Sequence, residues 1–167
     1  MIPAIPRRLA ASGAAALIGL GGALAGAVPA HAAGAAVRTC SVADLRLSMG
    51  RQDVGAGQLH WPIRFTNRST RTCALRGYPG VSVLDRAHRQ IGAAATRNTQ
   101  SYRTVTLRPG RTAVAVVHTT NGPIGGPCRP TGSSLRVFPP ASYRSLLVPA
   151  ALRVCSQVFS ITPVTAS

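Results

Sequence analysis

The stretch that decides the fold of this chain is Cys73-Ala74-Leu75-Arg76-Gly77-Tyr78-Pro79-Gly80-Val81-Ser82-Val83-Leu84. Proline presets φ for the second position of a turn, and glycine accepts the positive φ that a type II turn needs next. The sequence therefore predicts a turn at Pro79-Gly80. It also predicts a short strand over residues 81–84, where β-branched residues dominate.

The corner formed by Gly77, Tyr78, Pro79 and Gly80 holds a large amphipathic ring at the entry to that strand. In sandwich folds a corner tyrosine donates its hydroxyl proton to a backbone carbonyl, and we expect the same of Tyr78. The alternative is an exposed ring that stacks on a ligand. The first interpretation makes Tyr78 structural, and the second makes it a binding residue.

Alternation of apolar and polar residues predicts the other strands. The best signal is residues 58–67, where Leu59, Trp61, Ile63 and Phe65 share one face. Pro62 within this run indicates an edge strand or an irregular start. We expect a turn over residues 50–57 and a loop or short helical turn over 141–151. The other predicted strands cover residues 40–49, 90–95 (weakly), 104–107, 112–119, 135–138 and 152–162.

These patterns give about seven to eight short strands, turn signals about every ten residues, and no long helix. That combination is typical of an all-β fold, and we expect an Ig-like antiparallel β-sandwich. A chain of this length needs only one such domain.

Residues 1–32 have the features of an export signal peptide: Arg7-Arg8, an apolar run, and an Ala30-His31-Ala32 cleavage site. Cleavage would leave a short flexible lead, 33–39, and a single β-sandwich domain, 40–164. A membrane anchor is the weaker alternative, because the run is mostly Ala and Gly. Pro-Arg-Arg-Leu is a poor twin-arginine match and favours the general secretory route. We expect a secreted, extracellular protein, either released or associated with the cell wall, with no membrane span after cleavage.

The four cysteines all lie beyond residue 32, and an even count in an exported chain predicts two disulfides. Spacing alone leaves three pairings open. If residues 40–49 and 58–67 form a hairpin, Cys40 faces the end of the second strand, close to Cys73. We therefore expect Cys40–Cys73, which leaves Cys128–Cys155.

The mature part of the chain is strongly basic. Residues 33–167 contain 17 arginines and three aspartates, with no Lys or Glu, which gives a net charge of +14. A field of this sign attracts polyanions. The alternatives are a solvated charge that only aids solubility, and an Arg-rich composition that reflects a GC-rich genome. Export and the scarcity of aromatic residues argue against a nucleic-acid partner in vivo. The candidate polyanion-binding residues are Arg64, Arg68, Arg71, Arg76, Arg86, Arg89, Arg108 and Arg111.

Catalytic and metal-binding patterns are absent from the sequence. His60, His88 and His118 are not at ligand spacing, and the three aspartates do not form a pair suited to acid–base chemistry. We expect no enzyme activity, no metal and no cofactor. The predicted function is a cell-envelope-associated binding or structural module, with an anionic wall polymer or a secreted protein as its partner. The alternatives are an inhibitor or ligand of a secreted protease, acting through the loop 121–133 that Cys128 would pin, and, as a third class, a hydrolase.

Several of these motifs occur together in one known family. Cys40 before a strand, Asn67 at a strand end, the Cys73–Gly80 motif, Val105-Thr-Leu-Arg-Pro-Gly110, Cys128 and Cys155 resemble the actinobacterial domain of unknown function family DUF4232. The resemblance covers residues 40–164 and implies a β-sandwich that is secreted or attached to the envelope. It implies no activity. This chain lacks the lipoprotein cysteine box and the Ser/Thr/Pro spacer of many relatives.

Overall fold

The computed structural model describes residues 36–167, and Ala35–Ser167 form one compact unit. The predicted signal peptide, residues 1–32, lies outside the described residues. Residues 36–167 contain one 3-10 turn, η1 (Val42–Asp44), and twelve strands, of which eight have four residues or more. The all-β class predicted from the sequence is confirmed.

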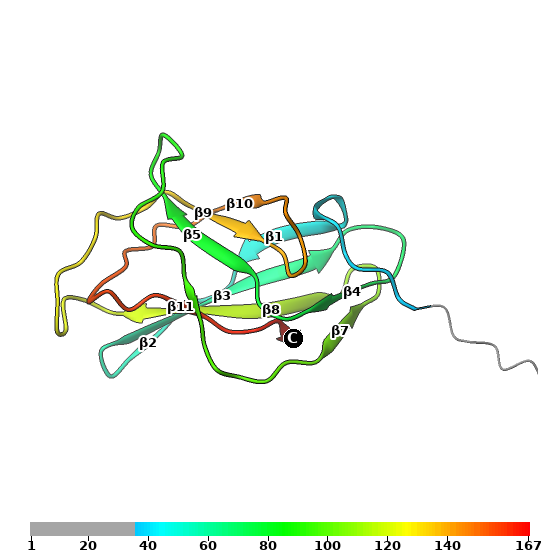
Figure 1. The fold of residues 1–167 in the computed structure, drawn as a ribbon, viewed down its shortest axis with the longest axis horizontal. Helices are drawn as coiled ribbons and strands as arrows, with labels where there is room; N and C mark the ends of the chain where they lie inside the picture. Colours follow the sequence, from blue (N-terminus) through cyan, green and yellow to red (C-terminus); the bar gives the residue numbers. More distant parts are fainter. Residues whose placement is uncertain (1–35) are drawn as a thin grey trace, which may run out of the picture. The chain divides into compact units, whose positions relative to one another are not determined.

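The strands form three sheets (Figure 1). The large sheet has the order β1-β3-β8-β11-β6, with β2 against β3 and β12 against β8. Its members are β1 (Leu45–Met49), β2 (Asp53–Gly55), β3 (Gln58–Asn67), β6 (Thr96–Arg97), β8 (Thr112–Thr120), β11 (Ser160–Ile161) and β12 (Thr165–Ala166). The second sheet has the order β10-β9-β5 and consists of β5 (Gly80–Leu84), β9 (Ser134–Phe138) and β10 (Leu146–Pro149). The third pairs β4 (Cys73–Arg76) with β7 (Thr104–Leu107).

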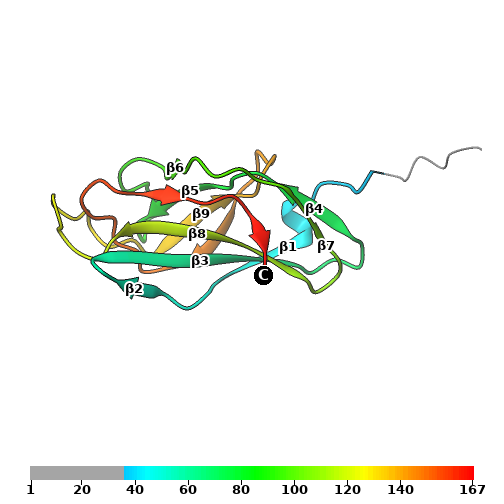
Figure 2. The same ribbon diagram turned by 90° about the horizontal axis from the view of Figure 1, so that it is seen from below.

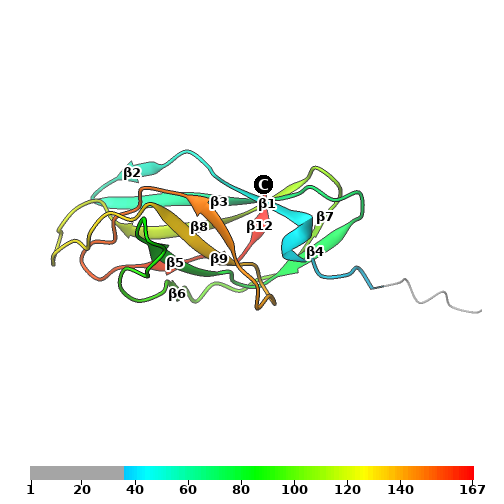
Figure 3. The same cartoon turned by 90° about the horizontal axis from the view of Figure 1, so that it is seen from above.

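The core lies between the large sheet and the β10-β9-β5 sheet, which Figures 2 and 3 show as two layers. Ile63 and Phe65 of β3 and Val117 of β8 contribute fully buried side chains from the large sheet. Leu135 and Val137 of β9 contribute them from the opposite layer. Full burial of one such side chain is worth about 1.5–3 kcal/mol, so these alternating positions specify which face of each strand points inward.

Pro62 does not mark an edge, because β3 lies between β1 and β8 in the sheet. The expectation of an edge strand is therefore wrong, and the reason is local. β1 ends at Met49 and β2 begins at Asp53, so Pro62 lies opposite the gap between two short strands that pair with the same edge of β3. The missing N–H of Pro62 costs no ladder hydrogen bond there, and its carbonyl accepts one from the N–H of Gly50 at 2.8 Å.

Two predicted elements near the N-terminus are shorter or more regular than expected. The strand expected over residues 40–49 begins only at Leu45, because η1 precedes it. The turn expected over 50–57 contains the short strand β2. The end of the predicted flexible lead is tied down, since Arg38 and Thr39 lie against Ala74 of β4.

The largest differences from the predicted strands lie in the second half of the chain. Residues 141–151 contain strand β10, and residues 90–95 contain no strand. The strand expected over 152–162 is reduced to β11, because Ser156 and Gln157 adopt φ of 54° and 56° and turn the chain. Two successive left-handed residues cannot continue a strand.

The Gly77–Gly80 corner differs from the predicted type II turn. The left-handed residue is Gly77, with φ of 102°, whereas Gly80 belongs to β5 and pairs with Phe138. The Tyr78 hydroxyl donates to the backbone carbonyls of Asn98 and Gln100, at 2.6 and 2.5 Å. The backbone-bonding expectation for Tyr78 is thus met, but its partners lie about twenty residues downstream, and the contact holds segment 98–100 against the corner.

We expect Tyr78→Phe to lower the free energy of unfolding by about 1–2 kcal/mol, because the two carbonyls lose their donor while the ring still packs. Urea denaturation of both proteins measures this difference. Tyr143→Phe is the matched control, since the Tyr143 side chain is fully exposed and no hydrogen bond of its hydroxyl occurs in the described residues. An unchanged stability in Tyr78→Phe would contradict a structural role for the hydroxyl.

Candidate functional site

Both predicted disulfides are present. Cys40–Cys73 has a Cα–Cα distance of 4.9 Å and fastens the segment before η1 to β4. Cys128–Cys155 has a Cα–Cα distance of 3.8 Å and joins the 121–133 loop to the segment before β11. The expected hairpin of β1 and β3, on which the first pairing was argued, is also present. Two disulfides indicate folding in an oxidising compartment.

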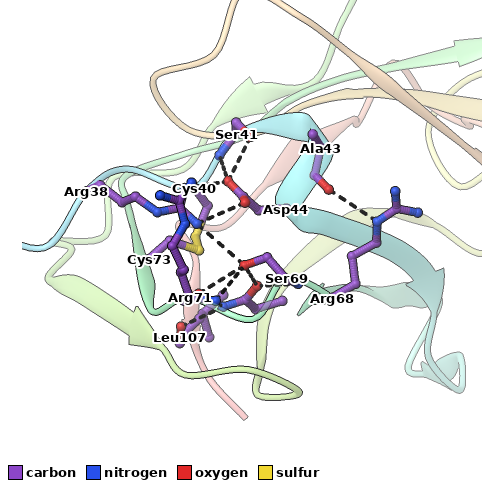
Figure 4. Close-up of polar contacts among 11 residues, drawn as sticks. Arg38, Cys40, Ser41, Ala43, Asp44, Arg68, Ser69, Arg71, Cys73 and Leu107 are labelled. Atoms are coloured by element: carbon purple, nitrogen blue, oxygen red, sulfur yellow. Dashed lines mark hydrogen bonds and ion pairs between the residues drawn. A yellow bond between two sulfur atoms is a disulfide. The ribbon is translucent and has the colours of Figure 1, made fainter.

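Asn67 brings two arginine-rich segments together at the end of β3. Its side chain is fully buried, and its Nδ2 donates to the carbonyls of Arg71 and Leu107 at 2.8 and 2.9 Å. Its Oδ1 accepts from the N–H and the hydroxyl of Ser69. Its backbone bonds Gly110 and Arg111 of the turn between β7 and β8. The 68–71 loop and the 108–111 turn therefore lie side by side (Figure 4 shows Ser69, Arg71 and Leu107).

We call the resulting surface the basic end. Arg68, Arg71, Arg108 and Arg111 are all exposed on the two joined segments. Arg64 is exposed on the outer face of β3, and Arg46, also exposed, is opposite Thr66 two pairs along the β1–β3 ladder. Arg46 is not among the arginines predicted from the sequence, although the alternation of Leu45 and Leu47 around it already predicts an outward side chain. The basic end consists of Arg46, Arg64, Arg68, Arg71, Arg108 and Arg111.

One aspartate lies next to the basic end, and it is already neutralised. Asp44 accepts two hydrogen bonds from the Arg38 guanidinium, at 2.7 and 2.9 Å, and two from the N–H and hydroxyl of Ser41 (Figure 4). The bonds from Arg38 hold the pKa of Asp44 well below its usual range; burial opposes this, and the bonds from Ser41 reinforce it. The arginines of the basic end therefore keep their positive field, because Arg38 rather than they compensates Asp44.

We expect Asp44→Asn to lower the free energy of unfolding by about 2 kcal/mol at neutral pH, because a buried charge-assisted pair is broken. The folded-state pKa is depressed, so the stabilisation is present above the ordinary Asp pKa and is lost as pH falls below about 4. The gap between wild type and variant should therefore narrow in acid, which denaturation at both pH values measures. Asp53→Asn on the exposed strand β2 is the control, and a pH-independent gap would contradict the assignment.

Three of the predicted arginines lie away from the basic end. Arg76 on β4 stacks over the Tyr102 ring, 5.2 Å from its centroid. Arg86 and Arg89 belong to the loop after β5, where the Arg89 guanidinium forms an ion pair with Asp85 at 2.9 Å. The candidate set thus divides into one coherent surface and two separate groups, and sequence proximity did not reveal this division.

The sheet also pairs two histidines that the sequence keeps 58 residues apart. His60 of β3 and His118 of β8 are directly opposite in the ladder, with ring centroids 4.7 Å apart. His118 Nε2 lies 2.6 Å from Gln58 Oε1, and its Nδ1 lies 3.4 Å from the Ser160 hydroxyl. Burial, and next the proximity of His60, lower the pKa of His118 and favour its neutral form. Within residues 36–167, no group of three or more His, Cys, Asp or Glu side chains is placed to hold a metal ion.

Residues 40–165 match the family model described as Domain of unknown function (DUF4232). The chain belongs to the DUF4232 family. This match confirms the resemblance drawn from the cysteines and the Gly-Tyr-Pro-Gly corner, and it spans every strand from β1 to β11. No curated protein and no solved structure matches the chain. The function of this DUF4232 domain therefore has to be argued from its own residues.

Helices contribute little to this DUF4232 domain. The helical content of residues 36–167 includes no segment with the length and apolar character required to cross a membrane.

Proposed function

We propose that this DUF4232 domain is an exported, non-enzymatic binding module whose basic end holds an anionic polymer of the cell envelope. The observation that carries the proposal is the Asn67 network, which places the 68–71 loop and the 108–111 turn side by side. The four exposed arginines are attached to two backbone segments that are bonded together, so little loop entropy has to be lost on binding.

The charge balance supports an anionic ligand. Among residues 36–167 only Arg38 and Arg89 are ion-paired with aspartates, so no aspartate neutralises the six arginines of the basic end. Arg68 donates through Nε to the Ala43 carbonyl at 3.2 Å and keeps its two terminal nitrogens for a ligand. Guanidinium groups bind phosphate in a bidentate manner, which suits the repeating phosphodiesters of a wall polymer. Association with such a polymer would keep an exported domain at the cell surface without a membrane anchor.

The test measures binding to soluble poly(glycerol phosphate) across a salt series. Counterion release makes the logarithm of the affinity fall linearly with the logarithm of the salt concentration, with a slope set by the number of phosphates contacted. We expect the quadruple variant R68Q/R71Q/R108Q/R111Q to lower that slope by about one for each contact removed. The control R86Q/R129Q/R144Q/R153Q makes the same change in net charge at four other exposed arginines.

Equal losses in the two quadruple variants would show that net charge alone attracts the polymer and would contradict the basic end as a site. Wild-type binding without salt dependence would contradict the polyanion proposal as a whole. Near-native denaturation curves for both variants ensure that a lost fold is not mistaken for a lost contact.

The 121–133 loop supports a second candidate, the inhibitor or ligand of a secreted protease. Ile124 on this loop is 55% exposed, and its carbonyl accepts a hydrogen bond from the Ser156 hydroxyl at 2.7 Å. The Cys128–Cys155 disulfide and the Ser156 N–H to Pro127 carbonyl bond also hold the loop. A pinned loop with an exposed apolar side chain is preorganised for a protease cleft. This candidate requires a stoichiometric complex that survives high salt and is lost in Ile124→Asp.

A further inference from the structure

Among the strands of residues 36–167, β7 pairs only with β4 and has an unpaired edge. On the other side of its partner β4, Ala74 uses its N–H and carbonyl to bond Arg38 and Cys40. Because Ala74 directs both groups away from β7, the Ala74–Thr106 pair is of the non-hydrogen-bonded kind. The N–H and carbonyl of Thr106 therefore point away from β4, and those of Thr104, two residues earlier, point the same way.

Strand β12 presents a second edge toward the same space. Val116 of β8 bonds Thr162 through both its N–H and its carbonyl, so Val114, two residues earlier, directs its own groups to this same side. Val114 is opposite Thr165, which makes that pair hydrogen-bonded and turns the N–H and carbonyl of Ala166 away from β8. No strand pairs with this side of β12 in residues 36–167.

A groove of about 460 Å³ lies between these two edges. The space is within the size range of ligand sites. Figure 1 shows the C-terminus beside β7, and both segments line the groove. Its lining residues include Tyr102, Thr104, Val105, Thr106, Val164 and Ala166.

The Tyr78 corner supports one wall of the groove. Tyr102 packs over Gly77, where an added Cβ would lie 3.7 Å from the ring, and its ring meets Tyr78 edge-on at 5.7 Å. The Tyr78 hydroxyl is hydrogen-bonded to the carbonyls of Asn98 and Gln100, and these two bonds position the segment that leads into β7. The corner therefore holds segment 98–103 in place beside the open edge.

The charged side chains around the groove are all arginines. Arg103 lines it, Arg76 stacks on Tyr102, and Arg97 lies 5.9 Å from the centroid of the Tyr78 ring. None of the three aspartates lines it. A second copy of this domain would bring like charges together at the edge and is disfavoured, whereas an acidic partner is complementary.

We propose that the groove binds an extended acidic peptide segment of another exported protein, added as a strand along β7. Main-chain hydrogen bonds to Thr104 and Thr106 supply the affinity, and the arginines select acidic side chains at alternate positions. The unpaired backbone groups on both sides favour a peptide over a polysaccharide, which has no regular series of amide donors and acceptors. The groove shares no lining residue with the basic end, although Arg108 directly follows β7, and the proposal does not depend on the proposed function.

The probe is a capped, fluorescently labelled (Val-Glu)₄ peptide, followed by anisotropy. We expect binding that is lost when the Val nitrogens of the peptide are methylated, because methylation removes donors and leaves the charge unchanged. On the protein, Thr106→Pro removes the outward N–H without removing a β4–β7 hydrogen bond, and it should weaken binding at least tenfold. Thr106→Ala keeps the backbone and should bind within about twofold of wild type.

Ala166→Pro tests the opposite edge near the chain end and remains informative if Thr106→Pro fails to fold. R68Q/R71Q/R108Q/R111Q should bind the peptide normally, which separates this groove from the basic end. The proposal is overturned if the peptide does not bind, or if N-methylation leaves the affinity unchanged. It is also overturned if R68Q/R71Q/R108Q/R111Q abolishes peptide binding, because the peptide would then be only another polyanion on the basic end.

Discussion

Replacing Asn67 with alanine is expected to destabilise the domain by about 3–5 kcal/mol, because the variant loses four hydrogen bonds made by one fully buried side chain. Asn67 is fully buried and makes four side-chain hydrogen bonds. Removal of the amide takes one hydrogen bond from each of the Arg71 and Leu107 carbonyls, and the N–H of Ser69 loses its acceptor. Each lost hydrogen bond is worth about 0.5–1.5 kcal/mol, and the unsatisfied N–H of Ser69 adds to the cost.

Urea denaturation at neutral pH measures the effect of Asn67→Ala. Asn121→Ala is the matched control, since Asn121 is exposed and its recorded bond to Gly57 uses the backbone. Any folded fraction of Asn67→Ala should also bind poly(glycerol phosphate) more weakly, because the 68–71 loop and the 108–111 turn are no longer held together. A stability loss below about 1 kcal/mol would contradict the network as the organiser of the basic end.

Removing the Cys40–Cys73 disulfide, by C40A/C73A, is expected to lower the free energy of unfolding by about 3–4 kcal/mol. The bond closes a loop of 33 residues that contains η1, β1, β2 and β3, and the loss reflects the greater chain entropy of the unfolded variant. For a domain of ordinary stability, this is a large fraction of the total. Urea denaturation of the two oxidised proteins gives the difference.

A reductant supplies the internal control for C40A/C73A. Reduced wild type loses both disulfides, so it should be less stable than the variant by about the contribution of Cys128–Cys155, which closes a 27-residue loop. Reduced wild type and oxidised C40A/C73A of equal stability would mean that Cys128–Cys155 contributes nothing. No change in C40A/C73A itself would contradict the chain-entropy account.

The local sequence pattern is sufficient to predict most of the strands. Alternation over residues 58–67 and 112–119 predicts β3 and β8 with their inward faces, because a strand with one buried face has a period of two. The disulfide pairing also follows from sequence, since it required only that the strands at 40–49 and 58–67 form a hairpin. Where the prediction is wrong, as at 152–162, a left-handed pair at Ser156-Gln157 interrupts a run that looks apolar and regular.

The functional surfaces depend on which strands become neighbours. Arg68 and Arg108 are forty residues apart, and only the register of β3 with β8 and the buried amide of Asn67 bring their segments together. The His60–His118 pair likewise depends on register, which no local pattern reveals.

By itself, the sequence determined the all-β class, the two disulfides, the family and the positive charge of this protein, because each depends on composition or on residues close together in the chain. The tertiary structure alone decided how the charge divides between the basic end and the other groups. It also decided that β7 and β12 leave a groove between two unpaired edges. These features arise from contacts between distant segments, whose register and direction are set when the sheets pack.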